Sequence, residues 1–245
     1  MKTIKLFIAL AIVLSIAPFA LKAQDDPEKR ATLPRREQSI IRIATVTAKG
    51  DLLKLKTELN TGLDAGLTVN QIKEVLVHLY AYAGFPRSLR GLQTFIAVLD
   101  ERKAKGINDI IGPKASPIRS EHSKYERGKA ILEKLTGVPE AGPKTGYAAF
   151  APEIEIFLKE HLFADIFERD VLTYVEREWV TVSVLSSIGG VEPMLRSHLN
   201  ICLNVGIAPD QLQQFTEVIK QTIGRKEARN AKKVVDEVLK NKSKE

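Results

Sequence analysis

The sequence predicts an all-α fold, and two observations support that class. Apolar residues recur three and four positions apart over most of the chain, as in Leu52, Leu55, Leu59 and Leu63, which is the spacing of one face of a helix. By contrast, no stretch shows the strict alternation of apolar and polar residues that a half-buried strand requires. Turn and capping residues divide the chain from Pro34 onward into helix-sized pieces.

A long segment of the chain occurs twice. The run E-L-N-T-G-L-D-A-G-L-T at 58–68 is similar to H-L-N-I-C-L-N-V-G-I-A at 198–208. Matching residues lie 140 positions apart: Leu59, Asn60, Leu63, Gly66, Gln71 and Gly84 correspond to Leu199, Asn200, Leu203, Gly206, Gln211 and Gly224. An internal repeat constrains the whole architecture. We therefore predict two tandem helical repeats related by a pseudo-twofold axis.

The first 23 residues have the pattern of a secretory signal. A basic start is followed by an apolar run from Leu6 to Leu21 and a small residue at Ala23, where we place the cleavage site. The run is shorter than the about 20 apolar residues of a membrane span. We expect a periplasmic or secreted protein without a stable membrane anchor after cleavage. The alternative is an uncleaved amphipathic or anchoring helix. Residues 24–33 are polar and are expected to be a linker.

The first repeat is expected to occupy residues 34–103 and to hold four helices. Glycine favours the left-handed conformation that follows a helix end, and threonine or aspartate caps a helix start. The residues that set the boundaries are Gly50-Asp51, Gly66, Thr68 and Gly84-Phe85-Pro86. The last helix is expected to run from about Arg87 to Lys103.

Residues 104–170 are expected to connect the repeats. Two loops rich in glycine and proline, 104–119 and 137–152, flank a helix, and Pro152 opens another helix to about Leu162. The second repeat, 171–240, then follows the helix order of the first. Its helices are expected at about 171–188, 192–205, 209–222 and 225–240.

Composition excludes several classes of protein. Removing the predicted signal removes Lys2, Lys5 and Lys22 and no acidic residue, so the formal charge falls from +7 to +4. Such a small positive net charge does not indicate a nucleic-acid partner. One cysteine excludes an intrachain disulfide. No pair of His, Cys or Asp has metal-ligand spacing, so we predict no structural metal.

These motifs resemble those of the carboxymuconolactone decarboxylase family, which is related to alkylhydroperoxidase D. The resemblance rests on H-L-N-I-C-L-N-V-G-I-A at 198–208 and on H-L-Y-A-Y-A-G-F-P at 78–86, and it covers roughly residues 33–239. It implies an alkylhydroperoxidase D-like helical fold and an activity on a small molecule. Relatives form rings of subunits, so the resemblance also implies a homo-oligomer, with a trimer as the expected size.

The peroxidase branch of this superfamily uses a C-x-x-C pair, in which one thiolate attacks a peroxide and the other resolves it. Val191 and Met194 stand at those positions in the second repeat, and Asp51 and Lys54 in the first. The antioxidant function is therefore a disfavoured alternative. Cys202 is expected to be a small buried hydrophobe, and loss of peroxide consumption in Cys202→Ser would revive the peroxidase hypothesis.

The decarboxylase branch needs no thiol, metal or organic cofactor. It requires a group that holds the substrate carboxylate, an electron sink and an acid that reprotonates carbon. Histidine suits the last role because its unperturbed pKa lies near 6.5. Neither repeat has a complete set of candidates: the first has His78 and Tyr82, and the second has His198, where the first has Glu58. We therefore predict one composite pocket containing these three side chains.

The remaining candidates each have a second interpretation. Glu178 or Glu37 would orient a histidine, or would only pair with the arginine before it. Arg87 and Arg90 would hold the substrate carboxylate, or lie on the surface. Glu74 would line the pocket, or only satisfy His78, and each histidine has a purely structural alternative. A non-catalytic small-molecule-binding module is therefore the third functional hypothesis.

Overall fold

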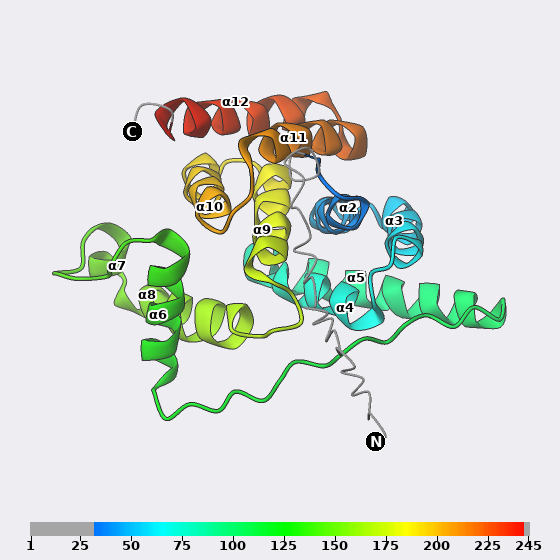
Figure 1. Cartoon of the computed structure of the whole chain (residues 1–245), viewed down its shortest axis with the longest axis horizontal. Coiled ribbons are helices and arrows are strands. Elements are labelled where there is room, and N and C mark those ends of the chain that lie inside the picture. Colours follow the sequence, from blue (N-terminus) through cyan, green and yellow to red (C-terminus); the bar gives the residue numbers. More distant parts are fainter. Residues whose placement is uncertain (1–31, 243–245) are drawn as a thin grey trace, which may run out of the picture.

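The computed structural model describes residues 32–242, and within that range the chain forms helices and loops without a strand (Figure 1). The predicted all-α class is confirmed. The predicted signal, residues 1–23, and most of the linker lie outside the described residues. No helix within 32–242 is long and apolar enough to cross a membrane.

The first half of the fold contains four helices whose ends follow the expected boundary residues closely. Gly50 adopts a left-handed conformation with φ of 75° at the end of the first helix, and Asp51 caps the second by accepting from the Lys54 amide. Thr68 and Gln71 form a reciprocal capping box. The helices are α2 (Arg35–Lys49), α3 (Leu52–Asp64), α4 (Val69–His78) and α5 (Tyr80–Ala104).

One boundary differs from the expectation. The third helix ends at His78 and a new helix starts at Tyr80, whereas one continuous helix to Ala83 was predicted. The predicted break at Gly84 is present as a kink, with φ of 78° and ψ of 162° inside α5. The apolar periodicity continues through Leu79, so it does not predict the interruption between His78 and Tyr80.

The connector crosses the molecule as an extended segment before it becomes helical (Figure 1). The Ile110 and Ile111 carbonyls accept from the first two amides of α4 at 2.9 Å, so they satisfy donors that a helix start leaves open. The connector helices are α6 (Lys124–Thr136), α7 (Gly146–Phe150), α8 (Pro152–Phe157) and the π-helix η1 (Leu158–Phe167). The predicted helix from Pro152 to Leu162 is therefore a short α-helix continued by a π-helix.

The second half packs around one central helix. It contains α9 (Tyr174–Ile188), α10 (Glu192–Asn204), α11 (Pro209–Ile223) and α12 (Arg225–Lys242), within about three residues of the expected spans. Helix α9 lies in the middle of the molecule between α2 and α10 (Figure 1). One hydrophobic core extends over both halves, and a second, smaller cluster joins α6 and η1 to α10.

Helix order and length repeat between the halves. Helices α2 and α9 have 15 residues each, and α3 and α10 have 13 each. Helices α2 and α9 also pack against each other. These similarities agree with a tandem duplication, which stays an interpretation of the sequence, as does the pseudo-twofold axis.

Candidate functional site

Helix α9 brings polar side chains into the centre of the molecule. All twelve residues from Glu176 to Ser187 are buried, which is the behaviour of a helix that is enclosed on every side. Three of them, Arg177, Glu178 and Thr181, have no exposed surface. Burying an unpaired polar group is costly, so these side chains are expected to have hydrogen-bond or ion-pair partners in the centre of the molecule.

Glu178 pairs with His198 of the neighbouring helix α10. The two side chains meet through Glu178 Oε2 and His198 Nδ1 at 2.9 Å, and the carboxylate is fully buried while the imidazole keeps 13% of its surface exposed. A carboxylate at Nδ1 fixes the orientation of the ring. The other ring nitrogen, Nε2, has no hydrogen-bond partner among residues 32–242.

Tyr82 reaches this pair from the first half. Its ring lies edge-on to His198, with the centroids 5.7 Å apart, and is also 5.7 Å from the ring of His78. The hydroxyl is buried and has no hydrogen-bond partner in the described part of the chain, and the same is true of Oε1 of Glu178. Burial, together with the nearby charge of Glu178, raises the pKa of the Tyr82 phenol. The hydroxyl therefore stays protonated and can act as a hydrogen-bond donor.

His78 is buried on the other side of Tyr82 and is held at both ring nitrogens. Nδ1 accepts from Arg177 Nη1 at 3.1 Å, so the proton is on Nε2, which donates to Thr181 Oγ1 at 2.9 Å. Phe167 of η1 packs edge-on against the ring at 4.9 Å. Both nitrogens of His78 are therefore occupied by protein groups, which suits an internal positioning role.

Glu74 forms a buried ion-pair network next to His78. It accepts from Arg177 Nη2 at 2.8 Å and from Arg169 at 2.8 and 3.0 Å. Burial alone would raise the pKa of Glu74, but the hydrogen bonds from the two arginines lower it on balance. Glu74 thus neutralises Arg177, and His78 is satisfied by Arg177 and Thr181 rather than by Glu74. The role of Glu74 in lining a substrate pocket stays a prediction.

The free energy of unfolding is expected to fall as the pH drops below about 6.5, the usual pKa of histidine. Burial, and then the charges of Arg177 and His198, lower the pKa of His78 well below that value. In this pH range the imidazole is protonated in the unfolded chain and stays neutral in the folded chain. Each pH unit therefore lowers the free energy of unfolding by up to about 1.4 kcal/mol. Urea unfolding at about pH 7.5 and 5.5 measures this slope. It should be smaller in His78→Gln, and equal slopes would contradict the assignment.

Cys202 lies one turn after His198 and is fully buried. Burial, followed by the nearby charge of Glu178, raises the pKa of its thiol well above the ordinary value. Because the thiolate is the reactive form, this environment makes Cys202 a poor nucleophile. Its packing in the main core fits the expectation of a small hydrophobe.

The two predicted anion-binding arginines are exposed and lie in the second part of α5. The guanidinium of Arg87 lies against Gly50 at the end of α2, where an added Cβ would come within 1.5 Å of Nη1. Arg90 donates to Gln93 at 2.7 Å. The structure does not bring either side chain into contact with the histidines, and their binding role stays a prediction.

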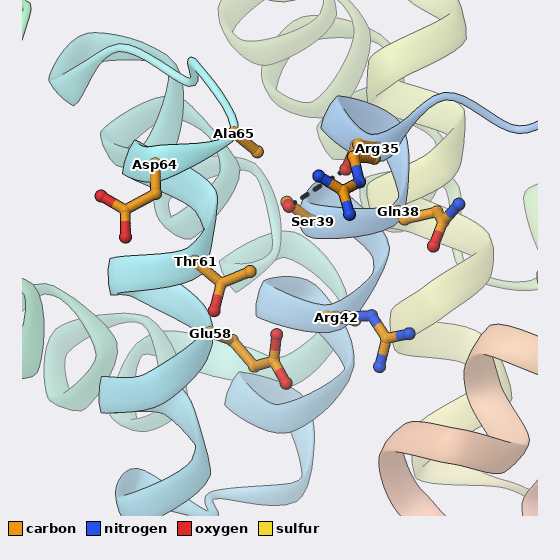
Figure 2. A pocket seen from close by; sticks show the side chains of 8 residues that line it. All are labelled: Arg35, Gln38, Ser39, Arg42, Glu58, Thr61, Asp64 and Ala65. Atoms are coloured by element: carbon orange, nitrogen blue, oxygen red, sulfur yellow. Dashed lines mark hydrogen bonds between the residues drawn. The ribbon is translucent and has the colours of Figure 1, made fainter.

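Glu58, which occupies the His198 position in the first half, lines a separate groove. Figure 2 shows it on α3 with its carboxylate directed toward α2, whereas the guanidinium of Arg42 on α2 points away from it. Ser39 and Thr61 also line this groove. The groove has a volume of about 440 Å³. Burial raises the pKa of Glu58, although the charge of Arg42 opposes the effect. The first half therefore has no counterpart of the imidazole–carboxylate pair at this position.

The structure brings together all four predicted catalytic side chains, two from each half: His78, Tyr82, Glu178 and His198. Sequence reasoning missed Thr181 and Arg169 as partners in this cluster and considered Arg177 only as a partner for Glu178. The available signal for Arg177 was its place beside Glu178 in a stretch that is otherwise mostly apolar. Among residues 32–242, no group of three or more His, Cys, Asp or Glu side chains could hold a metal ion.

The His198–Glu178 pair and the protonated hydroxyl of Tyr82 define a candidate acid–base site in an all-helical protein. Residues 19–96 match the model of the Carboxymuconolactone decarboxylase family, so the family resemblance read from the motif at 78–86 is confirmed. The motif at 198–208 lies outside the matched residues. His78 and Tyr82 lie inside the matched range, whereas Glu178 and His198 lie outside it. The match does not reach the second half of the fold, from Tyr174 onward.

The chain is also similar to the 4-carboxymuconolactone decarboxylase of Acinetobacter baylyi. The two are 36% identical over 59 residues, which are 24% of this chain and 44% of that protein. The chain thus spans less than half the length of this curated relative.

Proposed function

We propose that this protein is an exported decarboxylase or related lyase that uses acid–base chemistry without a cofactor. Its substrate is a small carboxylated lactone or a similar carbonyl compound. The observation that carries the proposal is the His198–Glu178 pair at 2.9 Å next to the Tyr82 hydroxyl, which has no hydrogen-bond partner among residues 32–242. The N-terminal sequence pattern supports export, and the similarity to a 4-carboxymuconolactone decarboxylase supports the reaction class.

The residues of the cluster fit the steps of such a reaction. The bond between the carboxylate and its carbon breaks, CO₂ leaves, and the electron pair passes into the lactone carbonyl. His198 then returns a proton to carbon from Nε2, while Glu178 stabilises the imidazolium that carries this proton. Tyr82 donates a hydrogen bond to the carbonyl oxygen as negative charge develops on it.

Arg177 and His78 support the reacting groups in this proposal. Both side chains are fully buried. The role proposed for them is therefore to position other residues and not to contact the substrate. Arg177 fixes His78, and the ring of His78 packs against Tyr82. A rigid second layer of this kind holds a catalytic side chain in its productive geometry.

The test is CO₂ release from 4-carboxymuconolactone and from related lactone acids by the purified protein. We expect the wild-type rate to exceed the rates of the His198→Gln variant and of buffer. If no lactone acid loses CO₂ faster with the wild-type protein than with that variant, the proposal is wrong.

A further inference from the structure

The connector contains a cluster of buried and partly buried charges that the proposed reaction does not use. Lys159 of η1 is 2% exposed and forms ion pairs with Glu155 of α8 and with Glu140 of the preceding loop. Lys144 contacts the same two carboxylates, at 2.6 Å from Glu155 and 3.4 Å from Glu140. Tyr125 of α6 donates to Glu155 at 2.9 Å. Two ammonium groups and two carboxylates therefore share one site.

This cluster lines a cavity of about 500 Å³ between α6, the loop after it, α7 and α8. The remaining wall is mainly apolar and includes Leu132, Val138, Tyr147 and Leu158. Ligand sites typically combine such apolar walls with a few convergent polar groups. The volume suits a small organic molecule.

The two lysines differ in how firmly they are held. The side chain of Lys159 is 3% exposed and its ammonium lies 5.2 Å from the centre of the Tyr125 ring. Its backbone is pressed against Gly128 of α6, where an added Cβ would come within 1.8 Å of the Lys159 carbonyl oxygen. Lys144 belongs to the loop between α6 and α7, and its side chain is 43% exposed. Lys144 is therefore the ammonium that another cation can replace.

The charge balance favours a cation at that position. Burial raises the pKa of Glu155, but Lys144, Lys159 and Tyr125 together lower it to about 2, so the carboxylate is ionised. If Lys144 moved out, Glu140 and Glu155 would face one ammonium, in a site where Glu155 is 10% exposed. A buried excess of negative charge is costly, and an incoming ammonium ion would remove it.

We propose that the connector cavity binds a small organic ammonium ion with an apolar body, and that Lys144 occupies the ammonium position in the unliganded chain. A primary ammonium group has three donors and can bridge Glu140 and Glu155 as Lys144 does. The hydrocarbon part would pack on Leu132, Val138 and Tyr147. A carboxylate ligand of the same size would instead meet two carboxylates. This site is independent of the proposed decarboxylase chemistry.

The test is calorimetric titration of n-hexylammonium into the full-length protein and its variants. Lys144→Met removes the competing ammonium, so this variant should bind at least about tenfold more tightly than wild type. Adding Glu140→Gln to that variant should weaken binding by a similar factor. Neutral n-hexanol and anionic hexanoate serve as matched ligands and should bind Lys144→Met at least about tenfold more weakly than the amine.

Two results would overturn the proposal. Equal affinity of n-hexanol and n-hexylammonium for Lys144→Met would show an apolar cavity without an ammonium site. Failure of the folded variant to bind the amine would exclude the cavity altogether. Circular dichroism establishes folding, and Lys144→Gln, which keeps a hydrogen-bond donor for Glu140, repeats the comparison in a second background.

Discussion

His198→Gln is expected to lower the turnover of the lactone acid by about 10²- to 10⁴-fold, the usual contribution of a general acid or base. Glutamine is similar in size and can still donate to Glu178, but it cannot carry the proton that the product carbon requires. Its effect should therefore appear mainly in kcat. The measurement is the rate of CO₂ release at saturating substrate.

The matched control for this variant is His161→Gln. His161 is 51% exposed and pairs with Asp165 at 3.1 Å, so it resembles His198 in having a carboxylate partner but lies on the surface of η1. We expect a rate close to wild type for this control. A wild-type rate for His198→Gln would remove His198 from the site, and an equal loss in both variants would indicate a general effect of losing a histidine.

Arg177→Met is expected to destabilise the fold by about 3–5 kcal/mol. The guanidinium is fully buried and pairs with Glu74, which is 3% exposed. Removing it leaves Glu74 with Arg169 alone and leaves His78 Nδ1 without a donor. Breaking a buried pair from one side is costly because the remaining charge stays in the interior. Urea unfolding of both proteins gives the difference.

Arg196→Met provides the comparison for an exposed pair. Arg196 contacts Glu237 at 2.6 Å, but both side chains are about 40% exposed. Its loss should cost less than about 1 kcal/mol. The double variant Arg177→Met with Glu74→Leu should recover part of the stability, because it removes both charges. An Arg177→Met protein as stable as Arg196→Met would show that the central network does not hold the fold together.

Local signals in the sequence predict most of the helices. The glycines at 50 and 84 and the cap at Thr68 act through short-range backbone geometry, so each was visible in the sequence and is present in the structure. The turn at Leu79 and the π-helix from Leu158 were missed for one reason. Both have backbone angles near the α-helical region, so apolar periodicity does not distinguish them from a regular helix.

Predicting the site was harder because its contacts join distant parts of the chain. The repeat identified Glu178 and His198 as candidates, 20 residues apart, but it could not decide whether Glu178 would pair with His198 or with the adjacent Arg177. The structure pairs it with His198, while Arg177 crosses to Glu74, 103 residues away. That choice depends on how α4 and α9 pack, and no local pattern encodes this packing.

The most direct test of a composite site is a double-mutant cycle between Tyr82 and His198, one residue from each half. The measured quantity is kcat/KM for CO₂ release by Tyr82→Phe, His198→Gln and the double variant. If the two side chains serve one reaction, the double variant should be about as slow as His198→Gln alone, because groups that act as a unit are not additive. Losses that multiply, or a Tyr82→Phe protein with the wild-type rate, would contradict a single site shared by the two halves.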